Sequence, residues 1–242
     1  MIDERLKSIA EMVDRQGTLL DVGTDHGYLP VYLVKSGKIK AAIASDVSRG
    51  SLAKAAQEVA KQKLESSIET RLGSGLEVIG ENDKIDTIVI AGMGGILISE
   101  LIDKRLDYIR KNSIDLIVQP VQSPESVRRY FHENGFEITA EKLAKADGRI
   151  YHIIKAKAGS RSSEQAAYVR DDIVFELGEL IMSDAGSESK ALLRELIGYK
   201  LKEQHKIKAK LEITESGNIG ERYKEVLRKI ESLDEVLRKL DW

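Results

Sequence analysis

Residues 19–30 read LLDVGTDHGYLP, and this stretch decides the fold. It begins as an apolar run, typical of a strand buried on both faces, breaks at Gly23 and Gly27, and continues as an apolar helical pattern. Glycine permits a tight turn, and without a Cβ it lets a ligand approach the backbone. Open parallel sheets build their nucleotide sites from a strand, a glycine turn and a helix in this order. We therefore expect a ligand-binding α/β sheet, with a tight turn that binds nothing as the alternative.

Composition limits the class of protein. The 242 residues are 42% hydrophobic, enough for one α/β domain and a smaller appendage. The net charge is −2, so any contact with nucleic acid must come from a local basic patch. There is no cysteine, which excludes disulfides, thiolate catalysis and the usual zinc sites. Without a long apolar segment or a signal peptide at the start, a cytoplasmic protein is expected.

The first two thirds of the chain repeat the strand-then-helix unit. Apolar runs alternate with amphipathic helical patterns five times, and two further strands follow with no helix between them. Those last two should pair antiparallel at the edge of the sheet. The pattern predicts a doubly wound Rossmann-like sheet of roughly seven strands. The predicted strands cover residues 18–22, 41–47, 68–72, 85–91, 115–120, 136–143 and 149–156.

Glycines or an acid follow each of the first four strands, so the ends of these strands should form one pocket. An acid at the end of the second strand, Asp46, can accept hydrogen bonds from both ribose hydroxyls of an adenosine, or it can simply cap the next helix. The first turn, Asp-x-Gly-x-x-x-Gly, lacks the middle glycine that admits a pyrophosphate. S-adenosylmethionine is an adenosine cofactor without a pyrophosphate and suits this turn. The candidate cofactor-binding residues are Asp21, Gly23, Thr24, Gly27, Asp46, Val47, Gly73, Ser74, Gly75, Ala91, Gly92, Met93 and Gly94.

The rest of the chain is helical. Residues 158–163 are small and polar, typical of a linker, so we expect domains at residues 1–158 and 164–242. A helix is predicted over 164–183. Apolar residues at steps of four and three then predict a long antiparallel hairpin resembling a coiled coil, with its reversal at 216–218. Such a seam can close within one chain or between two, and we expect a monomer or a weak dimer.

Five lysines with a single acid lie between residues 200 and 210. The usual explanation of such a run is a solvated helix face. The functional alternative is contact with an RNA backbone. Both interpretations stay open on the charges alone.

Several motifs together resemble one family. The segments RLKSIA (5–10), DVGTDHGYLP (21–30), RLGSGL (71–76), IAGMGG (90–95) and QP (119–120) resemble the bacterial TrmK family of tRNA adenine-22 N1-methyltransferases. The resemblance spans the whole chain and includes the helical region. The chain departs from the family's pattern at Asp46, where glutamate is expected, and over residues 14–17, where a proline is expected.

This resemblance implies a fold, a cofactor, a substrate and a reaction. The fold would be a class I methyltransferase sheet. The cofactor would be S-adenosyl-L-methionine, with no metal and no membrane, and the partner would be tRNA. A methyl group would move to adenine N1 in the D-arm, after the base is extruded from its stack. The residues expected to contact RNA are Arg5, Lys7, Gln119, Lys200, Lys206 and Lys210.

The resemblance also implies a catalytic segment. Asp25, His26 and Tyr28 follow the cofactor turn and are the candidate catalytic residues. A carboxylate or polar acceptor there would stabilise the developing positive charge, and Tyr28 would stack on the base. The alternatives are a structural hydrogen bond within the turn for His26 and a core position for Tyr28.

Two other functions remain as alternatives. One is an NAD-dependent oxidoreductase on a doubly wound sheet, which the missing Gly-x-Gly-x-x-Gly disfavours. The other is a scaffold without catalytic activity that binds protein partners through the helical hairpin.

Overall fold

The computed structural model describes residues 2–159, 172–184, 186–214 and 220–240. The chain divides into two compact units, Met1–Val169 and Arg170–Trp242. Most of the predicted linker lies outside the described residues, so the predicted division at residues 158 and 164 stays a prediction. Within the described ranges, no helix combines the length and the apolar character needed to cross a membrane.

The first unit is built on one seven-stranded sheet with the order β3-β2-β1-β4-β5-β7-β6. The first five strands are parallel, and β7 pairs antiparallel with both β5 and β6. The predicted doubly wound sheet and its antiparallel pair are therefore confirmed. The order reverses between β1 and β4, and the carboxyl ends at such a reversal are where open α/β sheets place their ligand crevice. The strands are β1 (Thr18–Val22), β2 (Ala41–Asp46), β3 (Ile68–Leu72), β4 (Thr87–Gly94), β5 (Asp115–Gln122), β6 (Phe136–Ala146) and β7 (Arg149–Ala158).

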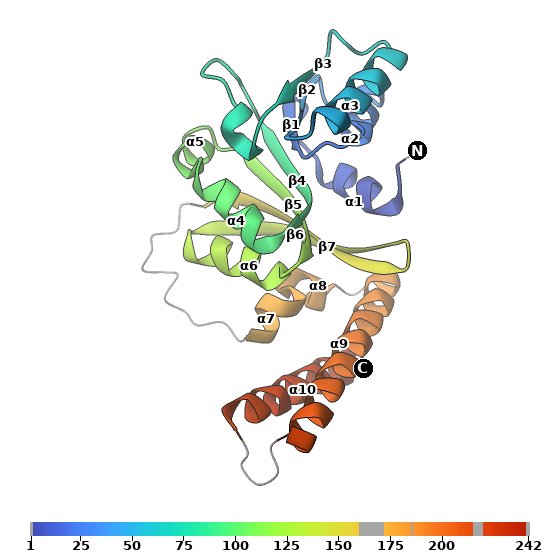
Figure 1. Ribbon diagram of the computed structural model, residues 1–242, viewed down its shortest axis with the longest axis vertical. Coiled ribbons are helices and arrows are strands. Elements are labelled where there is room, and N and C mark those ends of the chain that lie inside the picture. The colour runs from blue at the N-terminus through green and yellow to red at the C-terminus, as the bar shows by residue number, and fades with distance from the viewer. Residues whose placement is uncertain (1, 160–171, 185, 215–219, 241–242) are drawn as a thin grey trace. The chain divides into compact units, whose positions relative to one another are not determined.

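Helices cover both faces of this sheet (Figure 1). Helices α1, α2 and α3 pack on one face, and α4, α5 and α6 pack on the other. Each face has its own apolar core, as a sheet covered on both sides requires. The helices are α1 (Glu4–Met12), α2 (Tyr28–Lys35), α3 (Arg49–Lys61), α4 (Gly95–Asp103), α5 (Leu106–Lys111) and α6 (Pro124–Glu133), with a 3₁₀ turn η1 (Gly75–Val78).

The central strands divide their residues between the two cores. In β5, Leu116 and Val118 join the core under α4, α5 and α6, while Ile117 joins the core under α1, α2 and α3. All three are completely buried. Successive side chains of a strand point to opposite faces, so a strand covered on both sides must be apolar throughout. This is why the continuous apolar runs identified the strands.

Strands β4 and β5 extend further than predicted. The prediction ended β4 at Ala91 and placed a turn after it, which is wrong because β4 pairs with β5 as far as Gly94. The register shifts after Ala91 and leaves Gly92, at φ 78°, as an extra residue in a β-bulge. Strand β5 likewise continues past Pro120. A proline is tolerated there because β7 pairs with β5 only up to Val118, so no ladder bond to β7 is lost.

Two short elements and one turn were also not predicted correctly. Neither η1 nor α5 was predicted, because segments of four and six residues carry too little helical period to recognise. Strands β6 and β7 are longer than predicted and are joined by Asp147 and Gly148 alone, both at positive φ. Asp-Gly is the preferred sequence for such a two-residue hairpin turn.

The second unit is helical. It contains α7 (Asp172–Leu177), α8 (Glu179–Ser183), α9 (Ser187–Thr214) and α10 (Glu221–Leu240). The prediction of one helix through residue 183 is wrong in its described part, because Gly178 at φ 96° separates α7 from α8. Helices α9 and α10 pack together, with Ile197 and Leu233 fully buried. The predicted reversal at 216–218 lies outside the described residues, and the coiled-coil character of the seam stays a prediction.

The start of α4 provides a test of packing at the end of the sheet. A Cβ on Gly95 would lie 2.1 Å from the Ser123 carbonyl oxygen and 3.1 Å from Val127 Cγ2. Gly95→Ala should therefore lower the free energy of unfolding by about 1–3 kcal/mol in urea denaturation followed by circular dichroism. The matched control is Gly50→Ala in α3, where the nearest atom would lie at 3.6 Å, and it should be neutral or stabilising. Equal stability of the two variants would contradict this packing.

Candidate active site

The candidate site lies in the crevice where β1 and β4 end. Gly23 follows β1 at φ 74°, and a Cβ on it would lie 2.7 Å from Met93 Cε. The predicted first and fourth strand ends are therefore in contact. The N–H groups of Gly23 and Thr24 both donate to the Ser45 carbonyl oxygen at 2.9 Å, which fixes the turn to the end of β2. Three of the four predicted strand ends thus meet at one place.

Asp21 is the buried acid of this site. It is 5% exposed, and its Oδ2 accepts a hydrogen bond from Thr24 Oγ1 at 2.6 Å. Burial raises the pKa of Asp21 to about 6, because a carboxylate out of water is less stable than the neutral acid. The Thr24 hydrogen bond and the charge of Arg5 oppose this rise, while the charge of Asp46 adds to it. Asp21 therefore titrates near neutral pH.

Asp46 lies at the end of β2 and is held by two backbone groups. Its Oδ2 accepts from the Asp25 N–H at 3.2 Å, and its Oδ1 accepts from the Ser48 N–H at 2.8 Å. Ser48, rather than Asp46, is the N-cap of α3, since its side chain accepts from the Ser51 N–H. Each carboxylate oxygen of Asp46 keeps a second lone pair and can accept another hydrogen bond. Val47, which follows it, is 69% exposed.

The candidate catalytic segment leads from the turn into α2. Asp25 has φ 51°, unusual for a residue other than glycine, and the bond from its N–H to Asp46 holds it there. Its Oδ2 lies 2.7 Å from His26 Nδ1, so the hydrogen bond within the turn that was the alternative for His26 is present. The His26 ring stacks on Tyr28, with centroids 5.2 Å apart and planes 10° apart. Tyr28 is 36% exposed, so its alternative as a core aromatic is wrong.

Gln119 connects β5 to β4 and to α1 beneath the crevice. Its Oε1 accepts from Arg5 Nη1 at 2.8 Å and from the Gly92 N–H at 3.2 Å. Two donors on one side fix the orientation of the amide, so Nε2 must point the other way, where it is buried without a partner. Gln119 is completely buried, and direct contact with RNA is not possible in this position. The predicted role of Gln119 in binding RNA is therefore corrected.

The side chain of Arg5 also makes its contacts within the first unit. Besides Gln119, its guanidinium lies 3.7 Å from Asp3 and 5.7 Å above the ring of Tyr151 on β7. Arg5 therefore helps to build the site and is not a free surface cation. Tyr151 was missed from the sequence, because nothing local shows that β7 lies next to β5. Lys7 remains exposed and pairs with Glu4.

The glycines after β3 and β4 differ in what surrounds them. A Cβ on Gly75 would lie 2.4 Å from Leu101 Cδ2, so this glycine allows η1 to pack against α4. A Cβ on Gly73 would meet the Val78 side chain. Gly92 has no atom within 4 Å of its Cβ position. Gly92 thus leaves space at the crevice, whereas Gly75 is a packing position, and Ser74 between Gly73 and Gly75 is exposed.

The predicted RNA-binding lysines of the helical unit have different surroundings. Lys200 Nζ lies 2.7 Å from Glu176 Oε1, and Glu176 also binds Lys229 at 2.9 Å. Lys200 therefore joins α9 to α7, and its role in binding RNA stays a prediction. Lys206 is exposed and makes no polar contact among the described residues, while Lys210 is exposed on the same helix.

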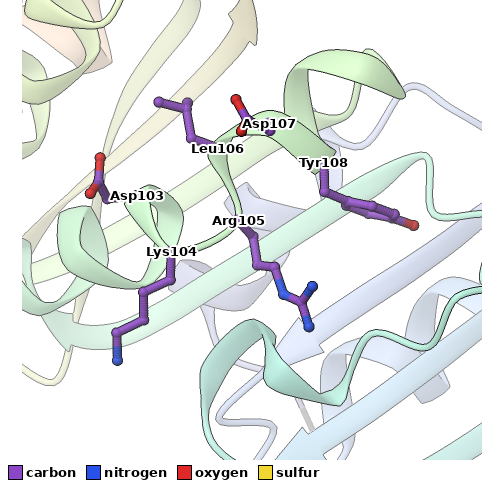
Figure 2. A pocket seen from close by; sticks show the side chains of 6 residues that line it. All are labelled: Asp103, Lys104, Arg105, Leu106, Asp107 and Tyr108. Atoms are coloured by element: carbon purple, nitrogen blue, oxygen red, sulfur yellow. The ribbon is translucent and has the colours of Figure 1, made fainter.

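A further pocket lies where α4 leads into α5, lined by residues 103–108 (Figure 2). It lies at the amino-terminal end of the strands, opposite the candidate site, because α4 runs back from the end of β4 toward the start of β5. Figure 2 shows its side chains diverging, with no convergent polar groups. Among the described residues, no three acidic or histidine side chains gather as a metal site would require. The crevice at β1 and β4 remains the candidate site.

Comparison with known proteins identifies the class. A family of methyltransferase domains matches residues 2–154. Together with the seven-stranded order and the crevice at the switch point, this match defines a Rossmann-like methyltransferase. The tRNA (adenine(22)-N(1))-methyltransferase of Bacillus subtilis (strain 168) is 30% identical over 237 residues, which cover 98% of this chain and 97% of that protein. The chain belongs to the TrmK family of tRNA (adenine(22)-N(1))-methyltransferases, as its motifs predicted.

Solved structures agree over the full length. The crystal structure of the B. subtilis m1A22 tRNA methyltransferase TrmK is 27% identical, covers 98% of this chain and 99% of its own, and has a TM-score of 0.82. The M. capricolum TrmK structure in complex with S-adenosyl-homocysteine is 25% identical, covers 98% of both chains and has a TM-score of 0.81. These relatives are methyltransferases, and they do not support the dehydrogenase or scaffold alternatives.

The raised pKa of Asp21 leads to a test of stability. The folded pKa of Asp21, about 6, exceeds the usual aspartate value. The contribution of Asp21 to the free energy of unfolding is therefore most favourable below about pH 4, where its carboxyl is neutral, and it falls as the pH rises through 6 and Asp21 ionises. Asp21→Asn should therefore raise the free energy of unfolding by about 3 kcal/mol at pH 8 and leave it unchanged at pH 4. Urea denaturation at both pH values measures this difference. Asp147→Asn, an exposed carboxylate in the β6–β7 turn, is the control and should show no pH-dependent gain. An equal gain for Asp21→Asn at both pH values would contradict the assignment.

Proposed function

We propose that the protein transfers a methyl group from S-adenosyl-L-methionine to N1 of adenine 22 in the D-arm of tRNA. The strongest support is the similarity of the whole chain to a known enzyme. The chain matches a tRNA (adenine(22)-N(1))-methyltransferase along its whole length. The crevice also has the Asp25, His26 and Tyr28 segment, which a simple nucleotide site does not require. In this function the protein acts in the cytoplasm on tRNA.

The residues at the crevice fit an adenosine cofactor. Asp46 has two free lone pairs for the ribose hydroxyls. Val47 is an exposed apolar residue next to it and suits the adenine ring. Gly92 leaves open space at the end of β4. The turn at Gly23 and Thr24 would hold the amino-acid end. When bound, the cofactor supplies an electrophilic methyl group on a positively charged sulfonium.

The acids of the site favour a cationic ligand. Asp21 is buried below the turn, and Asp46 contributes to the rise in its pKa. A positive charge close to both carboxylates would favour the ionised form of Asp21. The affinity for the cofactor should therefore increase as the pH rises through 6. The cost of burying Asp21 in the free protein is offset in this way on binding.

The catalytic segment can hold and move a proton. Adenine N1 carries its own lone pair, so no base is needed before it is methylated. Methylation makes the product cationic and its exocyclic amine more acidic, so a nearby base can take one of its protons. His26 Nδ1 is bound to Asp25, which leaves Nε2 to accept that proton. Tyr28 offers an exposed ring on which the adenine stacks.

The link between Asp46 and Asp25 ties cofactor binding to catalysis. The same carboxylate that would bind the ribose also accepts from the Asp25 N–H. It therefore helps to hold Asp25 at its positive φ and keeps the His26 ring in place. Positioning of the base relative to the methyl group would account for much of the rate enhancement.

The helical unit would contribute to tRNA binding. Lys206 and Lys210 are exposed on α9 and could contact the phosphate backbone. Packing of α9 on α10 closes the apolar seam within one chain, which supports a monomer. Because the target base lies in a folded arm, it must leave its stack to reach the crevice.

Methyl transfer is the direct test of the function. The protein should incorporate labelled methyl from S-adenosyl-L-methionine into unmodified tRNA, and digestion of the product should give 1-methyladenosine at position 22. A tRNA with guanine at position 22 is the control and should accept no methyl group. Transfer to another position or to no tRNA would contradict the proposal.

The two acids on either side of the turn should have separable roles. Asp46→Ala should weaken cofactor binding by roughly tenfold in calorimetry, since two hydrogen bonds to the ribose are lost. Asp25→Ala should bind the cofactor within a few-fold of the unchanged protein but lower kcat by roughly a hundredfold, because His26 loses its orienting carboxylate. A normal kcat for Asp25→Ala would return this segment to a structural role.

A further inference from the structure

A second pocket lies beside the catalytic segment, on the outer surface of α3. Its lining comes from two places in the chain: His26 and Tyr28 at the start of α2, and four residues of α3. The four are Lys54, Gln57, Glu58 and Lys61. Their spacing of three, four and seven places them on one face of the helix. Helices α2 and α3 lie side by side along this pocket (Figure 1).

The two sides of the pocket are held together by backbone packing. Gly27 lies between His26 and Tyr28 at φ 68°, and a Cβ on it would lie 3.2 Å from Ala55 Cβ and 3.3 Å from Ala55 Cα. The turn therefore packs closely against α3 at the residue that follows Lys54. A second contact further down joins Lys35 Nζ of α2 to Gln62 Oε1 at 2.7 Å. The stacked rings and the lysine face are thus fixed relative to each other.

The charges of the pocket favour an anion. Lys54 is exposed and has no polar contact among the described residues. Lys61 is 73% exposed and lies 3.7 Å from Glu58, whose other oxygen accepts from Gln62 Nε2 at 2.9 Å. Two ammonium groups therefore face the solvent with one partly engaged carboxylate between them.

Aromatic rings line the same surface. Tyr28 carries the stacked His26 ring, and both rings line the pocket. Flat rings next to exposed lysines are the chemistry that binds a nucleic-acid strand, because the rings stack on bases or ribose and the ammonium groups neutralise phosphates. Lys54 and Lys61 are seven residues apart, so they span roughly 10 Å along the helix.

We propose that this pocket binds the tRNA backbone next to the target adenine, with Lys54 and Lys61 on phosphates and Tyr28 between them and the crevice. The proposal rests on the proposed function and adds a second RNA-binding surface, within the catalytic unit itself. Because the pocket lies beside Tyr28, it would hold the RNA strand at the point from which the target nucleotide is extruded.

The test compares two pairs of lysines. Lys54→Ala/Lys61→Ala removes the proposed contacts. Lys104→Ala/Lys111→Ala removes the same charge from exposed lysines around α5, at the amino-terminal end of the strands. Binding of unmodified tRNA is measured by fluorescence anisotropy from low to high salt, with cofactor binding measured by calorimetry. The first pair should weaken tRNA binding roughly tenfold and reduce the salt slope by about one to two. It should raise KM for tRNA and leave kcat and cofactor affinity unchanged.

Two further results decide the interpretation. Lys54→Arg/Lys61→Arg keeps the charges and should bind tRNA as the unchanged protein does. If Lys54→Ala/Lys61→Ala has the same affinity for tRNA as Lys104→Ala/Lys111→Ala, the pocket is a solvated helix face and the inference is wrong. That outcome leaves the proposed function intact, provided that the unchanged protein methylates tRNA. Failure of the unchanged protein to bind tRNA at all would overturn both.

Discussion

The site depends on two backbone N–H groups, of Gly23 and Thr24, that donate to one carbonyl oxygen, Ser45 O. These bonds extend the pairing of β1 with β2 past the last residue of β1 and fix the turn to the neighbouring strand. Asp25 is then next to Asp46, and its N–H completes the connection. The positive φ of Gly23 is needed for this path, and only glycine adopts it without strain. The segment from Asp25 to Tyr28 is positioned from this turn.

The unfavourable features of the crevice share one explanation. Asp21 is a buried carboxylate, Gln119 has a buried donor without a partner, and Asp25 has a strained backbone. Each lowers the stability of the free protein, and stable folds retain such features mostly at functional sites. A cationic adenosine ligand would compensate the first. The cost of burying Asp21 is thus one that ligand binding can offset.

The two units use their charged residues differently. In the helical unit Lys200 and Lys229 both bind Glu176, which connects α9 and α10 to α7 and leaves fewer lysines for a partner. In the catalytic unit α3 presents Lys54 and Lys61 beside the His26 and Tyr28 rings. Of the lysines between residues 200 and 210, Lys200 is therefore engaged within its unit, whereas Lys206 stays exposed. Which ammonium groups are available depends on the acids that the fold brings to them.

The sequence by itself determined the sheet, its glycine turns and the family. Buried strands are continuous apolar runs, turns need glycine, and residues such as Asp25 and His26 are adjacent along the chain, so local patterns carry this information. Tertiary structure decided the bulge at Gly92, the burial of Gln119 beneath Arg5, and the contact of Gly27 with α3. Each of these joins residues that are distant in sequence. Such contacts follow from the order of the strands and the packing of helices on them, which no local period of the sequence encodes.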